Sequence, residues 1–158
     1  MDLNDWILAL HLISAFALVA AEVMFSIMIV GLWRSDNPAR IASTMPLGRI
    51  GTILVMIGMA GTVVFGVWLA ISLDEYQLWD GWIIVALVLW LIGGILGQLS
   101  GARYAEGGQR AGELAASGTT SSPELAETFG ASRAFWLHWA TVAVVVLLVI
   151  DMIWKPGA

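Results

Sequence analysis

The sequence predicts an all-α protein: a four-helix transmembrane bundle with both termini outside and a short interfacial helix before the last span. The chain of 158 residues is 59% hydrophobic and only 12% charged, whereas soluble domains are nearer half apolar and a quarter charged. Four apolar windows each reach the roughly 20 residues that a spanning helix needs. The polar stretches between them are mostly short. We therefore expect residues 1–158 to form one transmembrane domain.

The four predicted spans cover about residues 6–33, 50–73, 81–102 and 134–154. Each is far longer than a barrel strand, which favours helices. The second has a start signal in Ser43, Thr44 and Pro46, because hydroxyls cap free amides and proline suits the first turn. The acidic start MDLNDW lacks the basic residues of a secretory leader or presequence, so we expect the first helix to be retained.

The third loop, residues 103–133, is the longest polar segment. Its first part is expected to continue the third helix beyond the bilayer. SGTTSS then predicts a turn, and SSPELAETF predicts a short helix with Ser121 or Ser122 as N-cap and Pro123 in the first turn. The sequence leaves open whether this loop is a solvated linker or a docking site.

Charge sets the predicted orientation. Six of the seven basic residues lie in or beside the first and third loops: Arg34, Arg40, Arg49, Arg103, Arg110 and Arg133. The positive-inside rule makes that side cytoplasmic. The termini and second loop carry the acidic residues Asp2, Asp5, Asp74, Glu75 and Asp80, and Lys155 is their one basic neighbour. Tryptophans mark both predicted interfaces, Trp6, Trp79, Trp82 and Trp154 outside and Trp33, Trp136 and Trp139 inside.

Composition excludes several classes of function. The net charge of −5 argues against a nucleic-acid partner, which would need clustered Lys and Arg. The chain has no cysteine, so it has no disulfide, thiolate metal site or cysteine nucleophile. It also lacks a defensible catalytic triad, a phosphate-binding Gly-rich loop and an HExxH motif. We expect a protein that is not an enzyme.

Glycines predict close helix packing. Gly93, Gly97 and Gly101 form GxxxGxxxG in the third span, and Gly58 and Gly61 lie in the second. Small residues at such spacing let another helix backbone approach closely. The grooves either hold the bundle together or bind another protein, including a second copy.

Polar groups inside the spans are the candidate site. His11 and Glu22 are eleven residues apart and so project from one face of the first helix. A charge in mid-membrane costs about 3 kcal/mol or more, so Glu22 is expected to be protonated or paired. By depth, Glu22, His138 and Gln98 form a predicted polar cluster in the inner half of the bilayer.

A haem with two histidine ligands is excluded by depth, because His11 lies in the outer half and His138 in the inner half. Either histidine remains a candidate single ligand, and five methionines are available as a second ligand: Met24, Met28, Met56, Met59 and Met152. The alternative is that each histidine is a hydrogen-bonded structural group and each methionine fills the core. Glu22 could instead relay protons, with His11 on the same face.

Three segments carry a family resemblance: LHLISA (Leu10–Ala15), WIIVALVLWLIGGILG (Trp82–Gly97) and DMIWKPGA (Asp151–Ala158). They resemble an uncharacterised family of bacterial four-span integral membrane proteins. That family is similar in turn to copper-resistance-D-like membrane proteins, whose first helix also opens with a leucine–histidine pair. The resemblance implies a bacterial cytoplasmic membrane location and leaves His11 as a candidate copper or haem ligand.

We expect a non-catalytic accessory or scaffold subunit that packs beside a larger membrane complex or forms a homo-oligomer in the lipid bilayer. In this interpretation no cofactor is needed, and the polar groups fix helix register. The first alternative is a haem- or copper-binding membrane protein. The second is a small transporter or proton relay.

Overall fold

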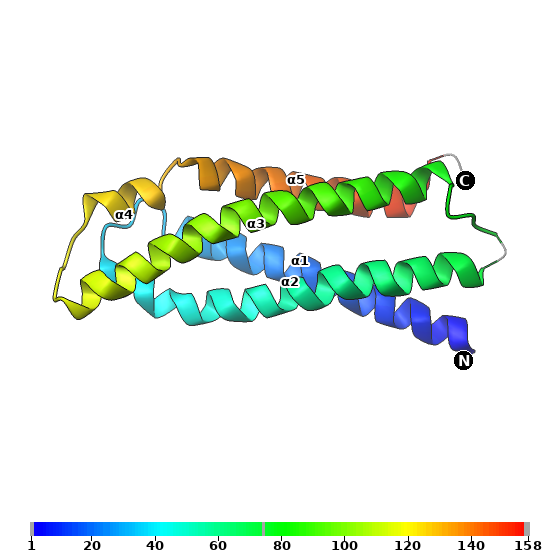
Figure 1. Ribbon diagram of the computed structural model, residues 1–158, viewed down its shortest axis with the longest axis horizontal. Coiled ribbons are helices and arrows are strands. Elements are labelled where there is room, and N and C mark those ends of the chain that lie inside the picture. Colours follow the sequence, from blue (N-terminus) through cyan, green and yellow to red (C-terminus); the bar gives the residue numbers. More distant parts are fainter. Residues whose placement is uncertain (1, 74, 157–158) are drawn as a thin grey trace.

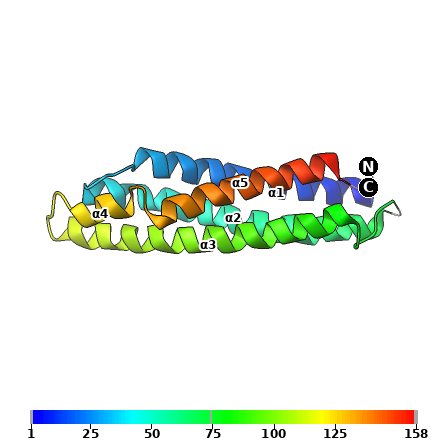
Figure 2. The same cartoon turned by 90° about the horizontal axis from the view of Figure 1, so that it is seen from above.

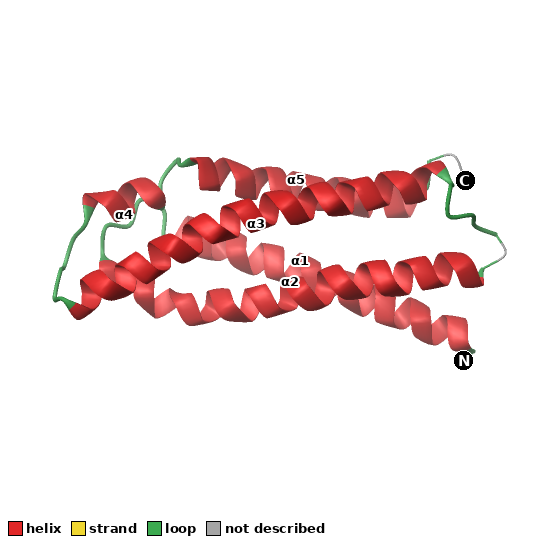
Figure 3. Ribbon diagram, in the orientation of Figure 1, coloured by secondary structure: helices red, strands yellow, loops and turns green. Residues whose placement is uncertain are grey.

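The computed structural model describes residues 2–73 and 75–156, and these residues form helices and no strand (Figure 3). The helices are α1 (Leu3–Gly31), α2 (Pro38–Ser72), α3 (Gly81–Ala116), α4 (Pro123–Thr128) and α5 (Arg133–Trp154). Four helical segments are long and apolar enough to cross a membrane. The predicted all-α four-helix bundle is confirmed. Asp74, Gly157 and Ala158, used above for charge and resemblance, lie outside the described residues.

The long helices run antiparallel in chain order (Figures 1 and 2). Helix α1 packs along α2, α3 packs along α5, and α2 and α3 join the two pairs. Helices α1 and α5 make only a few contacts with each other. Both termini lie at one end of the bundle and α4 lies at the other (Figure 1). The side of the membrane that each end occupies stays a prediction.

Helix α2 begins earlier than predicted. Asn37 is its N-cap and accepts a hydrogen bond from the Arg40 amide at 3.1 Å, and Pro38 occupies the first turn. The start signal assigned to Ser43, Thr44 and Pro46 was therefore wrong. Pro46 lies inside the helix, and the two hydroxyls donate to carbonyls three residues earlier instead of capping. The Asn-Pro start lies in the polar first loop, outside the apolar window.

Helices α2 and α3 extend past the bilayer. Their 35 and 36 residues correspond to about 50 Å each, against a hydrocarbon core of about 30 Å. The continuation of the third helix that the sequence predicted is confirmed. Beyond the membrane, the helix extensions, the first loop and α4 enclose a small apolar core of Leu32, Ile41, Ala111, Leu125 and Phe129. We call this unit the cap.

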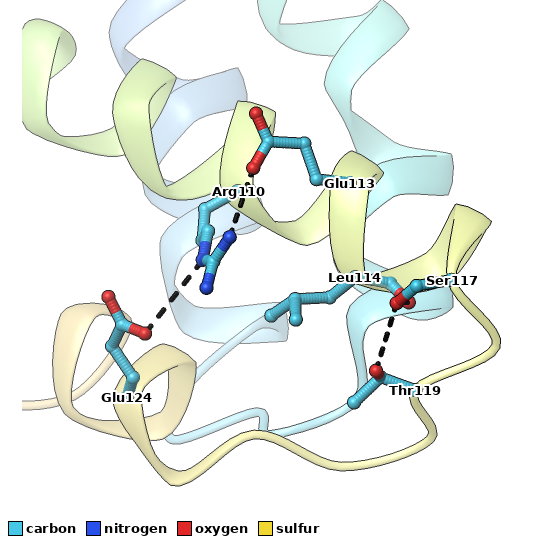
Figure 4. Close-up of polar contacts among 6 residues, drawn as sticks. All are labelled: Arg110, Glu113, Leu114, Ser117, Thr119 and Glu124. Carbon is cyan, nitrogen blue, oxygen red and sulfur yellow. Dashed lines mark hydrogen bonds and ion pairs between the residues drawn. The ribbon is translucent and has the colours of Figure 1, made fainter.

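The short helix α4 is confirmed, and it forms part of the cap. Its N-cap residue Ser122 makes no side-chain capping bond, and the Ser122 amide donates instead to the Asp36 carbonyl at 2.8 Å. Arg110 on α3 lies between Glu113, at 3.1 Å, and Glu124 on α4, at 3.9 Å (Figure 4). All three are largely exposed, so the ion pairs orient α4 while the apolar core stabilises it.

Four of the five predicted packing glycines pack the monomer's own helices. A side chain at Gly58 would meet Ser14 and Leu18 of α1, and one at Gly61 would meet Ser14. Gly93 and Gly97 face α5, where added Cβ atoms would lie 3.3 Å from Val144 and 3.6 Å from Thr141. A Cβ at Gly101 meets nothing within 4 Å. The GxxxGxxxG series therefore uses two glycines for the bundle and leaves the third exposed.

Candidate functional site

The polar pair Glu22–His138 lies at the seam where α1 meets α5. Glu22 Oε2 is 3.9 Å from His138 Nδ1, and the side chains are 13% and 6% exposed. Ser26, one turn after Glu22, completes the group with a hydrogen bond of 2.9 Å to His138 Nε2. The sequence brought Glu22 and His138 together by depth, and the structure places them in contact distance. We call Glu22, Ser26 and His138 the seam site.

Hydrogen bonding fixes the imidazole's orientation. The Ser26 hydroxyl donates its proton to the Glu22 carbonyl at 2.8 Å, so its oxygen accepts from Nε2–H of His138. Nδ1 then faces the carboxyl group. Glu22 Oε2 and His138 Nδ1 are 3.9 Å apart, which is beyond hydrogen-bonding distance, and Glu22 Oε2 has no hydrogen-bond partner among the described residues.

Gln98 does not join the seam site. It is exposed on α3, and no hydrogen bond links it to the described residues of the site. Depth predicted that Gln98 would join this cluster, but depth contains no information about which way a side chain projects. Its neighbour Ser100 is the buried group, and the Ser100 hydroxyl donates to the Ala134 carbonyl at 2.9 Å.

His11 lies on the other seam, between α1 and α2. Its Nδ1 is 3.0 Å from the carbonyl oxygen of Thr62. A carbonyl only accepts, so Nδ1 carries the proton and, in the neutral ring, Nε2 carries the lone pair. Gly66 makes room for this ring, since a Cβ there would lie 2.9 Å from His11 Cε1.

The two histidines are far apart, as the sequence predicted. His11 precedes Ser26, the partner of His138, by fifteen residues on one helix, which is about 22 Å along the axis. Three of the five candidate methionine ligands occupy space above glycines: Met24 over Gly51, Met28 over Gly48 and Met59 over Gly94. Met152 packs on the apolar cluster at the termini, and Met56 is 67% exposed.

Asp151, Trp82, Lys155 and Tyr76 form a second polar group, at the end of the bundle where the termini lie. This group was not identified from the sequence. Asp151 and Trp82 are buried, and in the described part of the chain Asp151 Oδ2 and Trp82 Nε1 have no hydrogen-bond partner. Lys155 donates to the Tyr76 hydroxyl at 2.6 Å and lies over the Trp82 ring at 5.3 Å. Asp151 could have been found from the sequence, because it is a charged residue inside an apolar window.

Ser26 of the seam site could also have been found, because it follows Glu22 by one helical turn, the spacing of side-chain neighbours.

Metal binding at the seam site would require its side chains to rearrange. Within residues 2–73 and 75–156, no three His, Asp or Glu side chains are grouped so that they could hold a metal ion. Both nitrogens of His138 already face Ser26 and Glu22, so His138 could ligate a metal only by breaking the seam site. His11, with Nε2 uncommitted, is the better candidate ligand.

Comparison with known proteins agrees with the membrane architecture. Searches of curated proteins and of solved structures gave no significant match. A family model described as "Predicted integral membrane protein (DUF2269)" matches residues 5–156. That match covers all five helices except the first residues of α1. The chain therefore belongs to this family of predicted integral membrane proteins, as its resemblance to an uncharacterised membrane family implied.

Proposed function

We propose that this protein is a non-catalytic accessory subunit of the bacterial cytoplasmic membrane, which packs beside a larger complex through one face of α3. The supporting observation is the exposed pair Gln98 and Gly101, three residues apart on that helix. Gly101 continues the glycine series beyond the part that α5 covers, and space above it is open. Ala102 and Ala105 are exposed on the same side and keep the face smooth.

The chemistry of this face favours a transmembrane helix of another protein as its occupant. The Gln98 carboxamide has two donors and an acceptor, and none is bonded within the described chain. A polar side chain facing lipid is unfavourable, and hydrogen bonds between membrane helices contribute roughly 1–2 kcal/mol in model peptides. Small residues beside the amide let the partner backbone come close enough to bond it.

Purification from native membranes in mild detergent tests this function. The wild-type protein should elute with a larger assembly, and Gly101→Leu and Gln98→Leu should release it as a monomer of unchanged thermal stability. Gly31→Leu is the matched control, because Gly31 also has nothing within 4 Å of an added Cβ. A wild-type protein recovered only as a monomer, or as an assembly of identical chains, would contradict a role in a larger complex.

Haem or copper binding is a second candidate, favoured by the free Nε2 of His11. An imidazole whose Nδ1–H is held by a backbone carbonyl is the usual arrangement of a metal-ligating histidine. A reduced-minus-oxidised absorption spectrum of the native protein tests haem, and metal analysis tests copper. A signal that His11→Gln abolishes would support this candidate. A featureless spectrum together with no bound copper would exclude it.

Proton transfer or transport is a third candidate, favoured by the position of the Glu22 carboxyl 3.9 Å from His138 Nδ1. Glu22→Gln keeps the size of the side chain but cannot release a proton to His138. Proton flux into liposomes containing the protein should then fall to the level of empty liposomes. Equal flux with the wild type and the variant would exclude a relay through Glu22.

A further inference from the structure

A charged groove lies where the cap meets the bundle. It lies between α3, α4 and the start of α5, and has a volume of about 470 Å³. Arg103, Glu106 and Arg110 line it from α3, and Ser132, Arg133 and Ala134 line it from the start of α5. Two of the three arginines mark the ends of the apolar windows of their helices. The groove is distinct from both the seam site and the exposed Gln98 face.

The groove lies at the level of lipid headgroups. Trp136 follows Arg133 by three residues and is 64% exposed, and Trp139 is 37% exposed one turn further. Exposed tryptophans mark the boundary between hydrocarbon and headgroups. Leu99, 49% exposed, precedes Arg103 by four residues on α3. Apolar surface therefore flanks the groove on the membrane side, where acyl chains would lie.

One buried hydrogen bond positions the two boundary arginines. Ser100 on α3 donates to the Ala134 carbonyl at the start of α5 at 2.9 Å. Arg103 lies three residues after this serine, and Arg133 immediately precedes the alanine. The bond thus fixes the arginines on opposite walls of the groove. They remain able to reorient because both side chains are exposed.

The charge of the groove is available for binding. Arg133 forms no ion pair within the described residues, and Arg103 has only Glu106 at 3.5 Å, with both side chains about two-thirds exposed. Such an exposed pair is weak and easily exchanged. The third arginine, Arg110, already forms ion pairs with Glu113 and Glu124, and so neutralises the negative charge that Glu124 of α4 brings to the groove. Arg103 and Arg133 therefore supply the uncommitted positive charge.

The start of α5 adds backbone donors. Helix α5 has 22 residues, and its N-cap Ser132 accepts from the Phe135 amide at 3.4 Å. The amides of Arg133 and Ala134 come earlier in the helix and have no intrahelical acceptor. Both residues line the groove. Free amides at the positive end of a helix dipole favour a bound anion.

We propose that this groove binds the phosphate of an anionic phospholipid in the leaflet on the cap side. Arg103 and Arg133 would pair with the phosphate oxygens from two sides, and guanidinium groups suit that geometry. The acyl chains would follow the apolar surface below Trp136 and Leu99. The site is independent of the proposed accessory role, because it uses another face and needs no protein partner.

Native mass spectrometry of the full chain, after exchange of phosphatidylglycerol against phosphatidylcholine, tests the proposal. The wild type should retain phosphatidylglycerol preferentially. Arg103→Gln and Arg133→Gln should each weaken retention about fivefold, while the exposed Arg49→Gln, with the same loss of charge on the same side, should not. Thermal unfolding in detergent should be the same for all three variants, which separates loss of the site from loss of the fold.

Four outcomes would overturn the lipid site. Equal retention of both lipids would show that the groove does not select phosphate charge. An equal loss in Arg49→Gln would show a diffuse surface effect. Unaltered retention in both groove variants would place the lipid elsewhere. Displacement of the lipid by millimolar inorganic phosphate would show that free phosphate, and not a lipid headgroup, is the ligand.

Discussion

Glu22 Oε2 lies 3.9 Å from His138 Nδ1 across the seam between α1 and α5, two helices that otherwise make few contacts. The separation is too long for a hydrogen bond, yet both side chains are largely buried. The neighbouring Ser26 bond holds the imidazole in the orientation that faces the carboxyl. The pair is thus the main polar link between the first and last spans.

This link predicts energetic coupling between Glu22 and His138. Glu22→Leu or His138→Leu should each destabilise the bundle by about 1–3 kcal/mol, because His138 Nδ1 or the Glu22 carboxyl then stays buried without the polar group that faces it. The double leucine variant should lose less than the sum, with a coupling energy of about 1–2 kcal/mol. Reversible unfolding in detergent micelles gives all four free energies of the cycle.

Arg103 and Glu106 provide the control cycle, since they form an ion pair in which the side chains are 68% and 70% exposed. Substitution of both by alanine should give a coupling energy near zero. Additive losses for Glu22 and His138, with no coupling beyond that of the control, would mean that the two groups do not stabilise one another.

Glycine substitutions should separate packed from open helix faces. In Gly58→Ala the added Cβ would lie 2.9 Å from the Ser14 carbonyl oxygen and from the Leu18 nitrogen, and these backbone atoms cannot move alone. The α1–α2 contact should weaken by about 1–3 kcal/mol. Gly101→Ala, where space is open, should leave the unfolding midpoint unchanged or slightly raised. Equal losses at both positions would contradict this packing.

The apolar core of the cap should control its resistance to proteases. Phe129 is 2% exposed and packs with Leu125 and Tyr104. Phe129→Ala should cost about 3–5 kcal/mol and loosen α4, which would speed tryptic cleavage at Arg110. Phe16→Ala, 71% exposed on the membrane helix α1, is the control and should cleave as the wild type does. Unaltered cleavage in Phe129→Ala would show that the cap does not depend on this core.

The sequence predicted the parts of the fold that depend on hydrophobicity and periodicity. Apolar length located the four spans, and Ser122-Pro123 located α4. Depth along the helices was sufficient to pair Glu22 with His138. Hydropathy could not locate the start of α2, because residues 38–49 form helix in a polar environment. The N-cap residue Asn37 and the apolar core around Ile41 stabilise that part of the helix.

Side-chain direction explains the remaining differences. Gln98 and Ser100 are two residues apart and nearly level in the membrane, yet one is exposed and the other is buried against α5. The direction of each depends on how α3 is rotated about its axis, which packing against α2 and α5 determines. The same rotation turns Gly93 and Gly97 toward α5 and leaves Gly101 exposed. A single sequence contains the periodicity of the helix but not this rotation.

The predicted orientation can be tested with introduced cysteines, because the chain has no native cysteine. Ser117 and Gln77 are exposed at opposite ends of the bundle, next to the cap and in the α2–α3 loop. With six basic residues on the cap side, the positive-inside rule places the cap in the cytoplasm. A membrane-impermeant maleimide added to intact spheroplasts should therefore label Gln77→Cys and spare Ser117→Cys. Lysed spheroplasts should label both, which confirms that each thiol can react. The reverse labelling pattern would place the termini inside and move the proposed lipid site to the outer leaflet.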